Sequence, residues 1–213
     1  MDLNIKSRWS SILEALPPPP ALDSPEQARD LEGVLRAQRL MDSELLNLVI
    51  EERDLSVFQF ARVLGEQFNP SALPVSASFF GRLFDESVAF VAVEKELWKR
   101  PRPFAISDRV TVIGKSPTTF SYPSGNSMLG ALYASILTRM LPQYEYKLSI
   151  LGSCICDARV TAGVHFPTDI EAGRLAATLL ISDLTRSRSD MADFENAARE
   201  IRIAFGLFNM HSL

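Results

Sequence analysis

Hydrophobic residues along the chain recur mostly at intervals of three and four positions. The longest such stretch runs from about residue 73 to 99, and its apolar positions are Phe79, Phe80, Leu83, Phe84, Val88, Phe90, Val91 and Leu97. This spacing is typical of a helix that is buried on a wide face. The alternation of apolar and polar positions that marks β-strands is nearly absent, and no internal repeat is visible. The pattern therefore predicts an all-α protein, folded as a compact helical bundle.

Start and stop signals divide the rest of the chain into further helices. Ser24-Pro25-Glu26-Gln27 predicts a helix start, because serine is a good cap, proline fits the first turn and Gln27 is placed for a capping box. This helix should reach about residue 40, and another should follow Ser56 until Asn69-Pro70 breaks it. The remaining helices are expected at about 42–52, 124–140, 143–162, 167–184 and 190–208.

Two proline-rich stretches stand out between the predicted helices. An amphipathic segment, residues 3–16, is stopped by Pro17–Pro20, which must be extended. Residues 100–123 contain four prolines and read as a long ordered loop, which is uncommon unless it is functional. At 213 residues we expect one domain spanning 1–213, with 1–23 as an N-terminal extension that carries the proline-rich turn.

Composition and charge narrow the classes of function. Hydrophobic residues at 46% and charged residues at 23% are ordinary for a globular protein, and the net charge of −4 argues against general nucleic-acid binding. No apolar run approaches the length of a membrane span, which predicts a soluble protein. The N-terminus does not read as a secretory signal, so the chain is either a mature or trimmed form or stays inside the cell. Cys154 and Cys156 point about 200° apart on a predicted helix, which argues against a disulfide between them.

Three short segments carry the candidate chemistry. Lys95 is followed after six residues by Arg102-Pro103, then comes Pro123-Ser124-Gly125-Asn126, and finally Arg159 with His165 and Asp169. Arginine forks and a lysine ammonium suit the oxygens of a phosphate group. A glycine turn that opens a helix aims backbone N–H groups at an anion. Each segment alone is weak, and its ordinary interpretation is a solvated helix end or a capped helix start.

The third segment contains the candidate reactive group. The chain has two histidines, and His211 lies third from the C-terminus, where fraying is expected. His165 is therefore the candidate nucleophile or proton carrier. Asp169, four residues on, can accept a hydrogen bond from one ring nitrogen and leave the other facing a substrate.

In this order the segments resemble the three-part signature of the soluble class A bacterial non-specific acid phosphatases. These enzymes belong to the phosphatidic acid phosphatase type 2 and vanadium haloperoxidase superfamily. Further similar residues are Leu16 to Pro20, Tyr122 before the glycine turn, and Ala172-Gly173-Arg174. The resemblance therefore covers most of the chain.

The resemblance implies the all-α acid phosphatase fold and a phosphomonoester hydrolase. His165 would attack phosphorus and form a phosphohistidine, while Asp169 would orient it. The phosphate oxygens would be held by Lys95, Arg102, Ser124, Gly125, Asn126 and Arg159. No metal or other cofactor is implied. The implied partners are a small phosphate ester and, as inhibitors, inorganic phosphate or vanadate, with a homodimer as the assembly. Relatives imply a periplasmic location, and the missing signal leaves a cytoplasmic one as the alternative.

The sequence departs from the family's pattern at two positions. Asn126 stands where the family has the histidine that acts as general acid, and Ala158 replaces a serine before Arg159. An amide cannot deliver a proton, so activity should be impaired or restricted to good leaving groups. Alternatively, water or another residue serves as the acid, the protein is a weakly catalytic phosphate-binding relative, or Asn126 was introduced to trap an intermediate.

Two other classes of function compete with a phosphatase. Vanadium-dependent haloperoxidases share the oxyanion pocket, but this chain is short for them and lacks the second histidine. A non-enzymatic phosphate-binding module is the stronger rival, because losing a proton donor is what a pseudoenzyme would show. A purely structural helical protein would require the three cations to match the pattern by accident.

Overall fold

The computed structural model describes residues 14–41 and 56–207. Within these ranges the chain forms helices and contains no β-strand, which confirms the predicted all-α fold. The elements are α2 (Pro25–Arg39), η1 (Val57–Phe60), α4 (Ala61–Leu64), α5 (Pro74–Trp98), α6 (Pro103–Ile106), α7 (Gly125–Met140), η2 (Pro142–Tyr144), α8 (Glu145–Thr161), α9 (Pro167–Leu184) and α10 (Arg188–Ala204).

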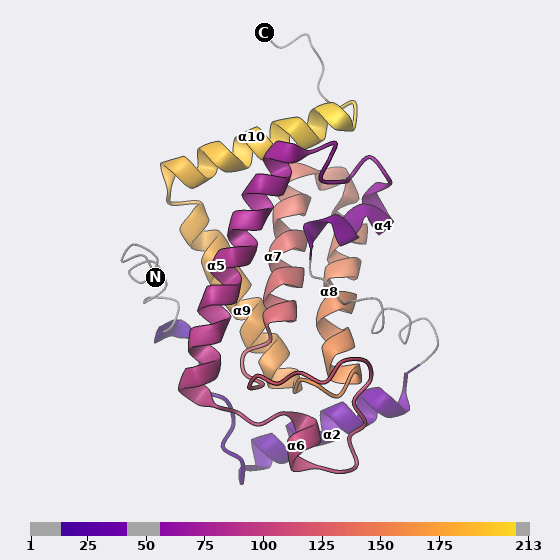
Figure 1. The fold of residues 1–213 in the computed structure, drawn as a ribbon, viewed down its shortest axis with the longest axis vertical. Coiled ribbons are helices and arrows are strands. Elements are labelled where there is room, and N and C mark those ends of the chain that lie inside the picture. The colour runs from indigo at the N-terminus through magenta and orange to yellow at the C-terminus, as the bar shows by residue number, and fades with distance from the viewer. Residues whose placement is uncertain (1–13, 42–55, 208–213) are drawn as a thin grey trace.

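Helix α7 lies at the centre of the bundle, and α5, α8 and α9 run beside it (Figure 1). Helix α10 crosses one end of the bundle, whereas α2 and α6 lie across the other end. The contact between α7 and α8 depends on two glycines, because a Cβ atom on Gly152 would lie 2.6 Å from the Cβ of Ala134 and one on Gly130 would lie 2.8 Å from Ile155 Cγ2. The main core is built from the apolar faces of α5, α7, α8, α9 and α10.

Most predicted helices are confirmed close to their expected bounds. The predicted 73–99, 124–140, 143–162 and 167–184 correspond to α5, α7, η2 with α8, and α9. The last helix, predicted at about 190–208, begins slightly earlier, after the Ser187 cap, and ends earlier, at Ala204. The helix expected at about 42–52 and most of the segment at 3–16 lie outside the described residues.

Three local expectations need correction. The helix after Ser56 does not continue to Asn69-Pro70 but ends at Gly65, whose positive φ of 89° terminates it. The stretch 100–123 is a loop as expected, but it contains the short helix α6. Ser24 caps α2 by accepting from the Gln27 backbone N–H at 3.1 Å, but the Gln27 side chain does not complete a capping box. Its Oε1 atom accepts instead from Arg100.

The described part of the N-terminal extension packs on the bundle. Leu16 is buried in the main core. The Tyr122 hydroxyl donates a hydrogen bond to the carbonyl of Pro17. The extension is thereby fixed to the loop that precedes α7.

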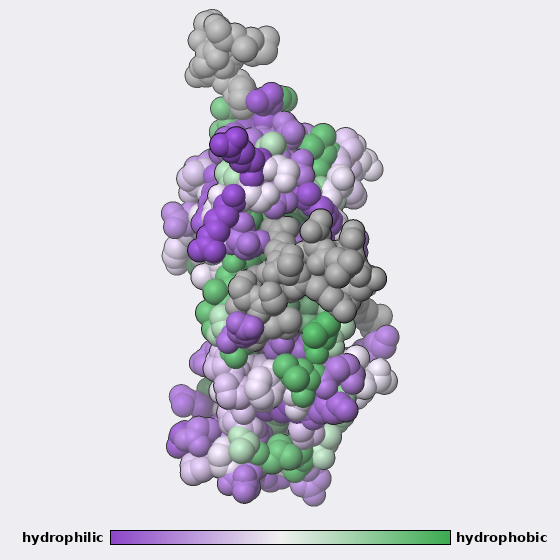
Figure 2. Space-filling view, turned by 90° about the vertical axis from the view of Figure 1, so that its left-hand side faces the viewer, coloured by the Kyte–Doolittle hydropathy of each residue, from purple (hydrophilic) through white to green (hydrophobic). Residues whose placement is uncertain are grey.

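The surface mixes polar and apolar side chains. Figure 2 shows the flank that α5 helps to form, where apolar side chains lie among hydrophilic ones. Helix α5 contributes five exposed apolar residues, namely Val75, Phe84, Val88, Val93 and Leu97. Among the described helices, none is both long enough and apolar enough to cross a bilayer.

Candidate functional site

The three candidate segments meet at the end of the bundle that α2 and α6 cover (Figure 1). The C-terminal end of α5, the start of α7, the end of α8 and the start of α9 all lie there. Hydrogen bonds join the segments directly, because the Ser124 backbone N–H donates to the Asp169 carbonyl at 3.0 Å and Arg102 Nη1 donates to the Val164 carbonyl at 2.6 Å. The segments, which extend from Lys95 to Asp169 in the sequence, thus share one site.

His165 lies between a cation and an anion. Arg102 Nη1 is 2.9 Å from its Nε2 atom, and Asp169 Oδ2 is 3.3 Å from its Nδ1 atom. An arginine guanidinium is only a donor, so Nε2 must be the acceptor. The ring proton therefore sits on Nδ1 and points to Asp169, and the Nε2 lone pair faces Arg102. Burial, then Arg102 and Lys95, lower the pKa of His165 well below its usual range, which keeps the ring neutral.

Asp169 is fully buried, and both oxygens of its carboxylate accept hydrogen bonds. Oδ2 accepts from the Phe166 backbone N–H at 2.8 Å, from the Ser121 hydroxyl and from His165. Oδ1 is paired with Arg100 Nη1 at 2.5 Å. Burial by itself would raise the pKa of Asp169, but the hydrogen bond with His165 and the charge of Arg100 outweigh it and lower the pKa to about 2. Asp169 is therefore ionised at neutral and mildly acidic pH.

Lys95 lies in the last turn of α5 and points into the loop before α7. Its Nζ donates to the carbonyls of Phe120 and, at 3.3 Å, Ser121. Burial, assisted by the charge of Arg102, lowers the pKa of Lys95 to about 7, although Asp169 partly opposes the shift. The ammonium is thus charged in acid and loses its proton near neutrality.

Arg102 lies beyond the end of α5 and is held by the surrounding backbone. Its Nε donates to the Thr119 carbonyl at 2.9 Å, and its Nη2 donates to the Thr119 hydroxyl at 3.2 Å. Burial lowers the pKa of Arg102 to about 10, and the nearby charge of Arg159 contributes to this shift while Asp169 opposes it. Arg102 still carries its charge at any physiological pH.

The glycine segment opens α7 as the sequence predicted. The Ser124 hydroxyl is the N-cap, since its oxygen accepts from the Ser127 backbone N–H at 3.3 Å and from the Ser127 hydroxyl at 3.0 Å. Its own proton remains for donation. Gly125 and Asn126 are the first two helical residues, whose backbone N–H groups have no carbonyl partner within the helix. This end of α7 therefore has the arrangement of an anion site.

Arg159 and Asn126 border this group of residues from α8 and α7, and both are half-buried. The Arg159 carbonyl accepts from the backbone N–H of His165 at 3.3 Å and of Val164 at 3.4 Å, which fixes the loop that carries the histidine. Gly163 makes this turn possible with a φ of +73°, and a Cβ there would lie 2.5 Å from the Thr111 carbonyl. The backbone of this loop thus places His165 next to Arg102.

Two residues of the site were not singled out by the sequence. Ser121 donates to Asp169, and it lies in a loop where no spacing rule marks a functional position. Arg100 directly follows the predicted 73–99 helix, and no motif in the sequence marks it. The structure buries it to 3% exposure and pairs it with two carboxylates, Asp30 and Asp169. The signal in the sequence that could have pointed to Arg100 is its place among closely spaced cations, with Lys99 and Arg102 beside it.

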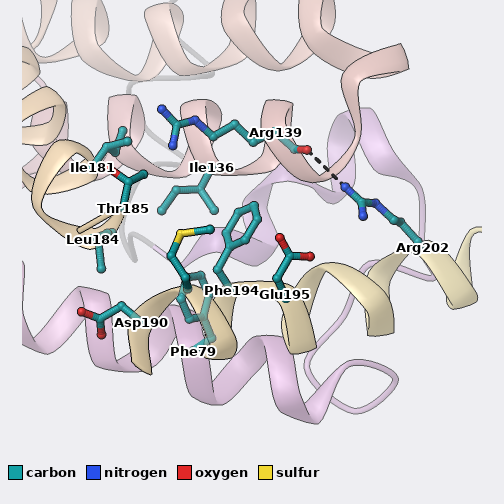
Figure 3. Close-up of a pocket in the computed structure, with 11 residues that line it drawn as sticks. Phe79, Ile136, Arg139, Ile181, Leu184, Thr185, Asp190, Phe194, Glu195 and Arg202 are labelled. Atoms are coloured by element: carbon teal, nitrogen blue, oxygen red, sulfur yellow. Dashed lines mark hydrogen bonds between the residues drawn. The ribbon is translucent and has the colours of Figure 1, made fainter. Parts of the chain in front are cut away.

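A separate hollow lies at the opposite end of the bundle, between α5, α7, α9 and α10 (Figure 3). Its walls are apolar, with Phe79, Ile136 and Phe194 among them, and Asp190 and Glu195 lie at its edge. It contains none of the residues of the three segments, so it is not the candidate site. Among the described residues, no group of three histidine, cysteine, aspartate or glutamate side chains is arranged to hold a metal ion. Cys154 and Cys156 are not joined by a disulfide, as expected.

Comparisons with known proteins agree with the all-α fold and with a phosphatase. The chain is 30% identical over 168 residues to a non-specific acid phosphatase of Salmonella typhimurium, covering 75% of this chain and 67% of that protein. It is 28% identical over 203 residues to an acid phosphatase of Zymomonas mobilis, covering 92% and 77%. The crystal structure of a transmembrane PAP2 type phosphatidylglycerolphosphate phosphatase from Bacillus subtilis superposes with a TM-score of 0.53 at 19% identity, covering 84% of this chain and 92% of that one, which shows the shared fold.

The sequence model of the PAP2 superfamily matches residues 78–190. This range runs from the first turns of α5 to the start of α10 and includes all three segments. The extent of this match, with the Salmonella relative, shows that the chain belongs to the PAP2 superfamily and is a phosphatase.

Proposed function

We propose that this protein hydrolyses phosphate monoesters through a phosphohistidine at His165, in the manner of the class A acid phosphatases that it resembles. The observation that carries the proposal is the position of His165, whose Nε2 lone pair faces Arg102 while Asp169 holds the opposite nitrogen. A neutral imidazole with one fixed tautomer is the state that a nucleophile requires.

The phosphate oxygens would be held by cations and by the start of α7. Lys95, Arg102 and Arg159 supply charge, and the Ser124 hydroxyl with the Gly125 backbone N–H supplies directed donors. Such groups stabilise the charge that spreads over the three equatorial oxygens during phosphoryl transfer. Arg102 would turn its N–H from Nε2 to a phosphate oxygen as the substrate binds, which frees the lone pair for attack.

The reaction would proceed in two displacements. Nε2 of His165 forms a bond to phosphorus while the bond from phosphorus to the ester oxygen breaks, and the electron pair leaves with that oxygen. The phosphorylated ring retains its Nδ1 proton and is cationic, so the carboxylate of Asp169 stabilises it. Water then attacks phosphorus, inorganic phosphate departs and His165 returns to its neutral form.

The leaving oxygen lacks the proton donor that the family uses. Asn126 sits at the second position of α7, where the family's histidine would sit, and its amide can donate a hydrogen bond but not a proton. We therefore infer a restriction to leaving groups that depart as stable anions, such as aryl oxides. The second candidate, a phosphate-binding protein without turnover, is favoured by the same observation, and turnover of an aryl phosphate separates the two.

The test is a leaving-group series of aryl and alkyl phosphates on three proteins, the natural chain, Asn126→His and Asn126→Gln. The proposal expects turnover of aryl esters by the natural chain, and a gain in Asn126→His of up to about 10²–10⁴-fold that is confined to alkyl esters. Asn126→Gln keeps an amide and should gain on neither. Equal gains on both classes of ester would show that residue 126 does not face the leaving oxygen. If the protein turns over no ester but still binds inorganic phosphate, the second candidate, a phosphate-binding protein without turnover, is the correct one.

The proposal also includes the inhibitors, the oligomeric state and the cellular location of the protein, all of which rest on the resemblance. Inorganic phosphate and vanadate should compete with substrate, because both present a tetrahedral or trigonal arrangement of oxygens to the same donors. A homodimer and a periplasmic location remain proposals of the same origin.

A further inference from the structure

Arg100 is a buried guanidinium that lies behind the proposed catalytic pair. Its Nη1 atom contacts Asp169 Oδ1 at 2.5 Å and the Thr168 hydroxyl at 2.8 Å. Its Nη2 atom contacts Asp30 Oδ2 and Gln27 Oε1, both at 2.6 Å. The guanidinium carbon also lies 4.1 Å from the centre of the Phe166 ring. Arg100 thus bridges two carboxylates and covers the residue that follows His165.

The other half of this network comes from α2. Asp30 and Gln27 lie on that helix and are both buried, with 5% and 3% of their surfaces exposed. Asp30 also accepts from the Thr168 hydroxyl and, at 3.2 Å, from the Thr168 backbone N–H in the first turn of α9. Helix α2 precedes the region that the PAP2 sequence model covers, which starts at residue 78. A helix outside the family's matched region therefore contacts the site through Arg100.

The two oxygens of Asp169 are divided between different partners. Arg100 occupies Oδ1, whereas His165, Ser121 and the Phe166 backbone N–H share Oδ2. The charge-assisted hydrogen bond from Arg100 to Oδ1 opposes rotation of the carboxylate, and so helps to keep Oδ2 toward His165.

We propose that Arg100, anchored by Asp30 and Gln27, is a positioning residue that holds Asp169 ionised and oriented toward His165. The inference rests on the proposed function, since it assigns to Arg100 a role in the reactivity of the same histidine. Arg100 acts through Asp169 and does not bind the substrate.

The charges around Asp169 fix the sign of the expected pH effect. Its pKa is lowered to about 2, with His165 and Arg100 as the main causes against its burial. Lys95, Arg102 and Tyr122 also interact electrostatically with it, and Asp30 lies beyond Arg100. Replacing Arg100 by a neutral residue removes a contacting cation, so the pKa of Asp169 rises. The acid limb of the kcat profile, which is the fall of kcat as the pH is lowered, therefore moves to higher pH.

The main test uses the double variant Arg100→Gln with Asp30→Asn, which removes the buried cation and one buried anion together, so that the net charge of the network is unchanged while Asp169 loses its contacting cation. Steady-state kinetics with an aryl phosphate should give a kcat at least about tenfold lower and an acid limb raised by about one unit or more. The KM and the inhibition constant of inorganic phosphate should change less than threefold, because the phosphate grip is intact. An unchanged acid limb in a folded double variant would overturn the proposal.

Two further variants sharpen the result. Arg100→Lys keeps the charge but offers a point ammonium that cannot bridge both carboxylates, so it should lower kcat severalfold and leave the acid limb in place. Should circular dichroism show the double variant to be unfolded, this single variant decides, and a kcat equal to that of the natural chain would overturn the proposal. Arg82→Gln is the matched control, because Arg82 pairs with Asp193 at 2.8 Å at the opposite end of the bundle. It should alter neither kcat nor the pH profile.

Failure of this inference differs from failure of the proposed function. His165→Ala should lose all phosphoenzyme and turnover. If it does so while the Arg100 variants keep a natural pH profile, only the positioning role is wrong. If His165→Ala still forms a phosphoenzyme, the proposed function itself is wrong, and the role of Arg100 with it.

Discussion

Arg102 Nη1 lies 2.9 Å from Nε2 of His165, so a permanently charged guanidinium donates to the nitrogen that we propose as the nucleophile. This contact determines the tautomer, because it leaves Nδ1 as the protonated atom next to Asp169. The same contact disfavours a proton on Nε2. With burial and Lys95, it helps to lower the pKa of His165.

Arg102→Gln should move the acid limb of kcat upward. Burial, Arg102 and Lys95 lower the pKa of His165 well below its usual range, so the natural chain should retain a neutral histidine in acid. Without the cation the pKa rises toward its ordinary value of about 6.5, and the fraction of neutral ring falls at acid pH. The measurement is kcat against pH with an aryl phosphate. Arg102→Lys keeps the charge and should retain most of the natural profile, whereas identical acid limbs in all three proteins would contradict the account.

The lowered pKa of Lys95 predicts that substrate affinity falls as the pH rises through neutrality. Burial and the neighbouring Arg102 lower its pKa to about 7, so the ammonium is present below that pH and absent above it. KM for an aryl phosphate that remains a dianion should rise by up to about tenfold per pH unit above the pKa, since the charged form binds best. Lys95→Arg stays charged, so its KM should be flat over this range. A rise in KM that is the same in both proteins would show that Lys95 is not the titrating group.

Ser121→Ala should destabilise the fold and weaken the support of Asp169. The Ser121 hydroxyl donates to Asp169 Oδ2 inside the protein, and a hydrogen bond to a buried charged group contributes about 1–3 kcal/mol. Chemical denaturation should show a loss of that size in the free energy of unfolding, together with a lower kcat. Ser87→Ala is the control, because Ser87 is equally buried but its hydroxyl has no hydrogen-bond partner in the described part of the chain. A loss in Ser87→Ala as large as in Ser121→Ala would mean that cavity formation, not the hydrogen bond, is measured.

Gly173→Ala on α9 should disturb the start of α7, against which Gly173 packs. A Cβ on Gly173 would lie 2.5 Å from the Ser124 carbonyl and 3.0 Å from the Met128 backbone nitrogen, so α9 would be pushed away from the glycine turn. Overpacking of this kind costs about 1–3 kcal/mol, and phosphate affinity should fall as well. Gly81→Ala on α5 meets nothing within 4 Å and should instead stabilise the protein by about 0.5–1 kcal/mol. Thermal unfolding with and without inorganic phosphate checks both variants, and a neutral Gly173→Ala would contradict the close approach.

The helices could be predicted from the sequence because their signals are local. The Ser24, Ser124 and Pro167 starts and the Pro142 break lie within one turn of the helix ends that they set. The order of Lys95, Arg102, His165 and Asp169 likewise pointed to one site, and the structure brings these four residues together. Local signals therefore determine the helix ends, and the ordered motifs identify these four residues of the site.

What the sequence did not reveal depends on contacts between distant positions. Gln27 matched a local capping pattern, yet its side chain binds Arg100, 73 residues away. The partners of Arg100 on α2 and α9 are 68 to 73 positions from it, and no periodicity relates them. Gly65 ended a helix earlier than the next Asn-Pro pair suggested, because a glycine with positive φ is as effective a stop as a proline. Tertiary hydrogen bonds and single backbone conformations account for these differences.

The central claim is that the reaction passes through a phosphoenzyme on His165, and rapid-quench labelling tests it most directly. The natural chain is mixed with a radiolabelled aryl phosphate and stopped in alkaline denaturant, because a phosphohistidine survives in base and hydrolyses in acid. The account predicts label on the peptide that contains His165 in the natural chain, and none in His165→Ala. A labelled His165→Ala protein, or steady turnover by the natural chain without any labelled intermediate, would contradict it.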